Sequence, residues 1–171
     1  MATISYKFDR QKAIEAILYL VPKVGDPDIY GICKLLYFVD KVSLSNYGRF
    51  LFGGKYFAMK EGVTPSNVYD LLKEIANEPT DELRIEGNEI IVSREYNPDL
   101  FSKSDIACLD EIINIYGKPP YKKRWLDSHD AAWKKNWDKR GNKNSVIIPI
   151  EDIVEQLDDS QALLNHLANI D

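Results

Sequence analysis

The sequence has few of the residues that bind metals or form disulfides. Its 171 residues include only two cysteines, Cys33 and Cys108, and two histidines, His129 and His166. Each cysteine stands alone in an apolar helical pattern, so we expect buried free thiols; a disulfide or a metal site is the alternative. The sequence contains neither His-Glu-x-x-His nor Cys-x-x-Cys, and we predict no metal site.

Long apolar runs are also missing. No stretch approaches the ~18 apolar residues that a membrane-spanning helix needs. The start, Met-Ala-Thr-Ile-Ser-Tyr-Lys, lacks the basic and apolar regions of a secretory signal. We therefore expect a cytoplasmic protein with no membrane partner.

Catalytic and nucleotide-binding motifs are absent as well. The sequence has no Gly-x-Ser-x-Gly, no Gly-Lys-Ser/Thr phosphate loop and no Gly-x-Gly-x-x-Gly. Catalytic residues can still converge from distant positions, and His129 is the place where acid–base chemistry would be sought. The simpler interpretation is that Asp127 or Ser128 caps a helix while His129 packs against tryptophans. We predict no enzymatic activity, no catalytic residue and no cofactor.

What the sequence contains is sufficient for one hydrophobic core. Hydrophobic residues make up 44% and charged residues 29% of the chain, which is ordinary for a globular domain. The length suits one domain, and we see no linker, repeat or low-complexity tract. We expect a single domain over residues 1–171.

Apolar residues recur at helical spacing over most of the chain. The predicted helices run from a cap at Asp9 to Val21, from about Asp28 to Tyr47, from Thr64 or Ser66 through Ile75, from Ser102 or Ser104 to Tyr116, from about Pro149 to Leu157, and from Ser160 to Ala168. The second helix is apolar on more than one face, so we expect it to be central.

Glycine pairs and alternating residues predict two hairpins. One lies near residues 50–59 around Gly53-Gly54, where a bent strand is the alternative, and the other spans 82–93 with its turn at Gly87-Asn88. Residues 146–150 read as a short strand or an extended lead-in to the next helix. The predicted fold class is mainly α, a single helical domain with a small antiparallel β element.

The net charge of −5 is unevenly distributed. Residues 118–143 contain nine Lys or Arg against three Asp, whereas residues 151–171 contain six acids and no Lys or Arg. We interpret the basic segment as a solvated region that the acidic C-terminal helix balances; an acidic partner or nucleic acid is the alternative. Overall acidity argues against nucleic acid as the main partner.

The basic segment also carries aromatic residues at a spacing of four. If it is one continuous helix, they share one stripe. The residues are Tyr121, Trp125, His129, Trp133 and Trp137.

Three stretches in order carry a resemblance to a known family. They are Lys34-Leu35-Leu36-Tyr37-Phe38-Val39-Asp40 with Tyr47-Gly48-Arg49, then Tyr56-Phe57-Ala58-Met59 with Gly62-Val63-Thr64-Pro65 and Val68-Tyr69-Asp70-Leu71-Leu72, and finally Leu126-Asp127-Ser128-His129-Asp130-Ala131-Ala132-Trp133. Over roughly residues 10–160 the chain resembles the Panacea domain of SocA-like antitoxins. It departs from the family pattern at Ser43, where a His is frequent, and at residues 62–65, where Gly-Pro-Val-Pro is frequent.

The resemblance implies an antitoxin that inactivates a toxin by direct contact, with the toxin encoded by the adjacent gene. Family members are paired with unrelated toxin types, and related proteins occur in phages and prophages. One branch acts as a proteolytic adaptor that delivers its toxin to a Clp-type protease, which is the first alternative. An enzyme centred on His129 and a nucleic-acid binder through residues 118–143 are the others.

The motif residues are predicted to build the scaffold. They are Lys34, Tyr37, Asp40, Gly48, Gly62, Pro65, Tyr69, His129 and Trp133. Lys34 and Asp40 are polar positions in an apolar helix, so each needs a partner or an exposed edge, and we expect structural pairing for both. Gly48 and Gly62 are interpreted as backbone requirements.

The contact surface is expected among aromatic and basic residues, because interfaces are enriched in Tyr, Trp and Arg. The candidates are Tyr47, Arg49, Phe50, Tyr56, Tyr121, Arg124, Trp125, Trp137 and Arg140.

We predict that Trp125→Ala and Trp137→Ala leave the protein folded but weaken neutralisation of the partner, because both tryptophans have strongly charged neighbours. Soluble yield and growth protection in co-expression would check this. Loss of soluble protein would assign the two side chains to the core instead.

Overall fold

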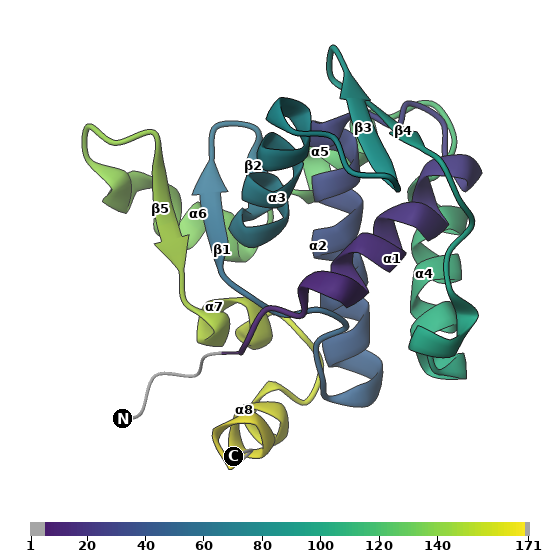
Figure 1. Cartoon of the computed structure of the whole chain (residues 1–171). Coiled ribbons are helices and arrows are strands. Elements are labelled where there is room, and N and C mark those ends of the chain that lie inside the picture. Colours follow the sequence, from purple (N-terminus) through teal and green to yellow (C-terminus); the bar gives the residue numbers. More distant parts are fainter. Residues whose placement is uncertain (1–5, 170–171) are drawn as a thin grey trace.

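The computed structural model describes residues 6–169, and most of this range is helical (Figure 1). The helices are α1 (Arg10–Leu20), α2 (Ile29–Tyr47), α3 (Ser66–Asn77), α4 (Lys103–Tyr116), α5 (Lys122–Asp127), α6 (Ala131–Trp137), α7 (Ile150–Glu155) and α8 (Ser160–Ala168). Short 3-10 turns cover Val21–Lys23, Pro98–Leu100 and Asp138–Arg140. The strands are β1 (Tyr56–Met59), β2 (Gly62–Pro65), β3 (Leu83–Glu86), β4 (Glu89–Val92) and β5 (Ser145–Ile148). The mainly α prediction with a small antiparallel β element is confirmed.

Helix α2 runs through the middle of the fold, with α1, α3, α4, α5, α7 and β2 packed around it (Figure 1). Its residues Ile32, Leu35, Leu36 and Val39 have no exposed surface. Asp28 caps its start by accepting a hydrogen bond from the Gly31 N–H. Gly48 ends it with φ 69°, the left-handed conformation predicted from the sequence.

The larger sheet has the strand order β2-β1-β5, and both pairings are antiparallel. Tyr56 lies opposite Pro65 on one side and Ile148 on the other. Strand β5 therefore brings the C-terminal third of the chain against a strand that follows α2. The extended segment predicted around residue 146 is this strand.

The position predicted for the first hairpin is wrong. Its turn is Lys60-Glu61, between β1 and β2, whereas Gly53-Gly54 lies in a loop. Both glycines have positive φ, and a Cβ on Gly53 would lie 2.8 Å from the Lys7 carbonyl oxygen. These glycines serve the close approach of the N-terminal segment rather than a turn.

The second hairpin is where the sequence places it. Strands β3 and β4 flank Gly87-Asn88, and Gly87 has φ 64°. The Asn88 carbonyl accepts a hydrogen bond from the Ile29 N–H, so the hairpin tip contacts the start of α2.

Of the caps predicted for α1, α3 and α4, two are confirmed and one is wrong. Asp9 accepts from the Lys12 N–H, and Ser102 forms a capping box with Asp105. Helix α3 begins at Ser66 without a side-chain cap, because Pro65 occupies the capping position.

The basic segment is not one helix. Helices α5 and α6 are separated at residues 128–130, and Asp130 caps α6 by accepting from the Trp133 N–H. Lys135 of α6 pairs with Asp152 at 2.8 Å and with Glu155 at 3.2 Å, so α7 balances part of the basic charge.

Cys33 and Cys108 are free and buried. Among residues 6–169 no helix combines the length and apolarity that crossing a membrane requires.

The carboxylate of Asp40 is buried in the middle of α2 and fixes the loop that follows this helix. It accepts hydrogen bonds from the N–H groups of Leu51 and Phe52 at 2.7 and 3.3 Å and from the Tyr56 hydroxyl. The expected structural pairing of Asp40 is thereby confirmed. Burial raises the pKa of this carboxyl from 3.8 to about 7, although these hydrogen bonds oppose the shift.

This raised pKa predicts a pH dependence of stability. Between pH about 4 and 7 the folded protein retains a proton on Asp40 that the unfolded chain releases, so the free energy of unfolding falls as pH rises. The variant Asp40→Asn removes this contribution and should show a flatter dependence in urea unfolding over that range. Equal slopes in both proteins would show that the hydrogen bonds keep Asp40 ionised.

Candidate functional site

Four aromatic rings from α5, α6 and the break between them contact one another in sequence order, and we call them the aromatic ladder (Trp125, His129, Trp133 and Trp137). Successive ring centroids are 4.1, 4.5 and 5.2 Å apart. The guanidinium of Arg140 continues the series at 3.7 Å from the Trp137 ring. The predicted stripe is therefore present despite the break between the helices.

Tyr121 does not join the ladder. Its ring stacks on Arg124 at 4.2 Å.

Hydrogen bonds attach the ladder to the turn between β1 and β2. The Trp133 indole N–H donates to the Met59 carbonyl at 2.7 Å, and the Trp125 indole N–H donates to a Glu61 carboxylate oxygen at 3.0 Å. The position of the turn is consequently set by α5 and α6 as well as by the sheet.

His129 is held from both ring nitrogens. Nδ1 lies 2.7 Å from the Trp125 carbonyl oxygen and Nε2 lies 2.9 Å from the Lys60 carbonyl oxygen. A carbonyl oxygen only accepts, so both bonds form together only when both nitrogens carry a proton. With both nitrogens facing backbone oxygens, His129 has none directed at a substrate. It packs between Trp125 and Trp133 as predicted, but the helix cap is Asp130 rather than Asp127 or Ser128.

Gly62 allows the turn to approach the ladder segment. A Cβ at this position would lie 2.2 Å from Ser128 Oγ and 2.7 Å from Ser128 Cβ, and Gly62 has φ 114°. The neighbouring Val63 N–H donates to the Ser128 carbonyl at 2.8 Å. The interpretation of Gly62 as a backbone requirement is confirmed.

Asp130 joins α6 to α2 and to the end of α7. Its carboxylate accepts hydrogen bonds from the Tyr37 hydroxyl, from Lys41 at 3.0 Å and from Gln156 at 3.1 Å, while also capping α6. Tyr37 is thus part of the scaffold, as predicted.

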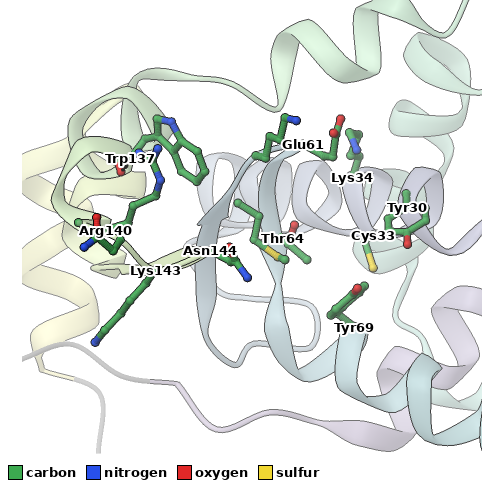
Figure 2. A pocket seen from close by; sticks show the side chains of 14 residues that line it. Tyr30, Cys33, Lys34, Glu61, Thr64, Tyr69, Trp137, Arg140, Lys143 and Asn144 are labelled. Atoms are coloured by element: carbon green, nitrogen blue, oxygen red, sulfur yellow. Dashed lines mark hydrogen bonds between the residues drawn. The ribbon is translucent and has the colours of Figure 1, made fainter.

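A half-open cavity of about 510 Å³ lies between α2, the β1–β2 turn, α3 and the loop that follows α6. Figure 2 shows Trp137, Arg140 and Lys143 on one side of it and Tyr30, Lys34 and Tyr69 on the other. The full lining is Tyr30, Cys33, Lys34, Met59, Lys60, Glu61, Thr64, Tyr69, Trp137, Arg140, Gly141, Asn142, Lys143 and Asn144. The volume falls within the ~300–1,000 Å³ typical of ligand sites.

Lys34 does not have the structural partner that we expected. No hydrogen bond or ion pair connects its amine to another of the residues 6–169, and it lines the cavity instead. Burial lowers the pKa of this amine, while the nearby charges of Glu61 and Asp28 oppose the shift. Tyr69, also predicted as scaffold, lines the same cavity and packs partly on the core.

Three of the predicted contact residues are buried. Phe50 and Tyr56 are 5% and 1% exposed, and Tyr56 donates to Asp40. Arg124 is 3% exposed because it donates to the carbonyl oxygens of Tyr116 and Gly25. These side chains stabilise the interior and offer no contact surface in this structure.

The remaining candidates lie in separate places. Tyr47 is exposed at the C-terminal end of α2, and Arg49 there donates to Ser104. Trp125 is 45% exposed, and its indole N–H reaches Glu61 at the cavity. Trp137 and Arg140 line the cavity itself, and Trp137 also packs partly on the core. The cavity therefore brings together Trp137 and Arg140, whereas Tyr47 and Arg49 lie apart from it.

Sequence reasoning missed the other residues of the cavity. Tyr30, Lys60, Glu61 and Lys143 were not predicted as contact residues. The two charged residues before Gly62 form the hairpin turn, and placing that turn at Gly53-Gly54 concealed them.

No group of three or more His, Cys, Asp or Glu side chains in the described part of the chain is arranged to hold a metal ion.

Comparison with known protein families gives a match over most of the chain. A family model described as antitoxin SocA-like, Panacea domain, matches residues 32–134, which is more than half of the chain. No curated protein and no solved structure matches significantly.

Because Gly62 lies so close to Ser128, we predict that adding a single methyl group at Gly62 lowers the stability of the protein. Gly62→Ala should lower the free energy of unfolding by ~1–3 kcal/mol more than Gly87→Ala, because overlap with Ser128 adds to backbone strain. Gly87 is the matched control, since it has positive φ but no atom within 4 Å of the place that a Cβ would occupy. Equal losses in urea unfolding would contradict the close approach of the turn to the ladder.

Proposed function

The chain belongs to the Panacea-domain family of SocA-like antitoxins, and on that premise we propose that it neutralises a toxin by binding it directly. The toxin is expected to be the product of the adjacent gene. In this proposal the protein is not an enzyme and acts in the cytoplasm without a cofactor.

One observation supports direct binding above others, namely the composition of the surface around the cavity. Tyr30 is 43% and Trp125 is 45% exposed, while Trp137 and Arg140 line the hollow. Aromatic residues and arginine are the side chains that most often dominate the binding energy of protein interfaces. Because Trp137 and Arg140 line a concave surface, they can surround a group that projects from the partner.

The surface is also held in shape before any partner arrives. The rings of the ladder contact one another, and its hydrogen bonds to Met59, Lys60 and Glu61 fix the turn that forms one wall. A preorganised surface loses less conformational freedom on binding, which favours affinity.

The arrangement of His129 supports a role without catalysis. Both ring nitrogens face backbone carbonyl oxygens, whereas a general base needs a nitrogen within reach of the substrate. His129 in this proposal supports the wall of the binding surface.

The proposal predicts the outcome of a growth assay. Expression of the adjacent gene alone should arrest growth, and co-expression with this chain should restore growth and yield a complex that co-purifies. Neutralisation by contact would be contradicted if the product of the adjacent gene is harmless alone, or if it stays toxic and does not bind this chain in co-expression.

The half-life of the neighbour protein distinguishes a steric block from delivery to a protease. In the proposed mechanism its half-life is unchanged or longer when the two proteins are expressed together. A shorter half-life that depends on a Clp-type protease would identify the chain as an adaptor.

A further inference from the structure

The cavity carries an excess of positive charge in a chain that is negative overall. Lys34, Lys60, Arg140 and Lys143 contribute four cations to its lining, and Glu61 is the one acid among the described residues that line it. The whole chain has a net charge of −5. The charge of this surface is therefore local, and it attracts groups that the rest of the molecule repels.

These four cations have no ion-pair partner among residues 6–169. Elsewhere lysines and arginines do pair, as Lys41 does with Asp130 and Arg94 with Glu15. Glu61 offsets only one of these four charges: it acts on Lys34 without forming an ion pair within the described part of the chain, and its carboxylate accepts the Trp125 indole N–H at 3.0 Å.

Lys34 is the most informative of the four. It projects from the central helix, its side chain is partly buried, and burial lowers the pKa of its amine. A charged group withdrawn from water without a hydrogen-bond acceptor is unfavourable. An arriving carboxylate would supply the missing acceptor and would gain from the reduced screening inside the cavity.

The other walls exclude a small hydrated anion as the best-fitting ligand. Tyr30, Tyr69 and Trp137 present aromatic surface, and Met59 adds an apolar side chain. An ion of a few atoms would leave most of the volume of about 510 Å³ unfilled. The lining suits a carboxylate attached to an apolar body, such as an acidic residue with its neighbours on a protein segment.

The surroundings favour a protein rather than a free metabolite or a nucleic acid. Trp125 is 45% exposed beside the turn, where it binds Glu61, and it does not line the cavity, so a ligand confined to the cavity would leave it unused. A nucleic acid would require cations along an extended track, whereas here the four unpaired cations belong to the lining of one cavity.

We propose that the cavity receives an acidic side chain of the toxin, whose carboxylate pairs with Lys34 while Arg140 and Lys143 attract it at the rim. This inference rests on the proposed function, since the toxin supplies the acidic segment.

The test measures the dissociation constant of the complex with the purified neighbour protein by calorimetry. Lys34→Met should weaken binding by about 30-fold or more, as expected when one member of a buried charge pair is removed. Arg140→Gln should weaken it less and should lower the dependence of affinity on salt. The control is Lys103→Met, an exposed lysine at the start of α4 that has no ion pair among the described residues, and it should change the affinity less than about twofold.

Charge exchange tests the pairing without relying on loss of binding. Lys34→Glu should abolish binding, and one acidic residue of the toxin, changed to lysine, should restore it. Thermal unfolding of each variant alone establishes that it is folded. If the Lys34 variants do not fold, the affinity of Arg140→Gln for the toxin tests the inference instead.

Three results would count against the inference. Wild-type affinity in both Lys34→Met and Arg140→Gln would overturn it and leave the proposed function intact. No binding by the wild-type chain would overturn both. A rise in melting temperature with succinate, combined with unchanged toxin affinity in Lys34→Met, would identify a small-molecule site instead.

Discussion

The chain between α2 and β1 has no regular structure, and the carboxylate of Asp40 holds it in place. This single buried group binds the backbone of residues 51 and 52 and the hydroxyl of Tyr56, the first residue of β1. The start of β1 sets the register of both neighbouring strands. The turn that follows β1 forms one wall of the cavity, so the shape of the binding surface depends on a carboxylate buried in the core.

Asp130 has the corresponding role on the opposite wall. It caps α6, which carries Trp133 and Trp137, and it accepts hydrogen bonds from α2 and from Gln156, the residue that follows α7. Helix α6 is therefore tied to the same central helix that carries Lys34. The two walls of the cavity meet through the hydrogen bonds between the ladder and the turn, and Gly62 provides the space for that contact. The structure assembles one surface from segments that are more than a hundred residues apart in the chain.

The sequence was sufficient for elements that local signals determine. The central helix, the caps at Asp9 and Ser102 and the hairpin at Gly87-Asn88 follow from periodicity, capping and turn chemistry. The spacing of four in the ladder also predicted real contacts, because the His129 ring stays in line across the break between α5 and α6.

Local signals failed where a distant segment decides the role of a residue. Gly53-Gly54 resembles a hairpin turn, but the positive φ of these residues accommodates the N-terminal segment. Tyr56 and Arg124 are of the residue types that interfaces favour, yet both are buried. The Tyr56 hydroxyl donates to Asp40 and the Arg124 guanidinium donates to the Gly25 carbonyl oxygen. Conversely, Lys34 was expected to have a partner and has none among the described residues. The cavity could not be predicted because its lining comes from four separate segments.

Some residues that line the cavity also support the core, whereas others can be substituted with little effect on the fold. Lys34 and Tyr69 stand on helices of the core, whereas the side chain of Lys60 and residues 141–144 are exposed and contribute little to packing. Substitutions at exposed positions outside such contacts usually change stability by less than about 0.5 kcal/mol. Mutation can therefore reshape the rim while the fold persists, so that evolution can exchange one partner for another without first having to rebuild the protein.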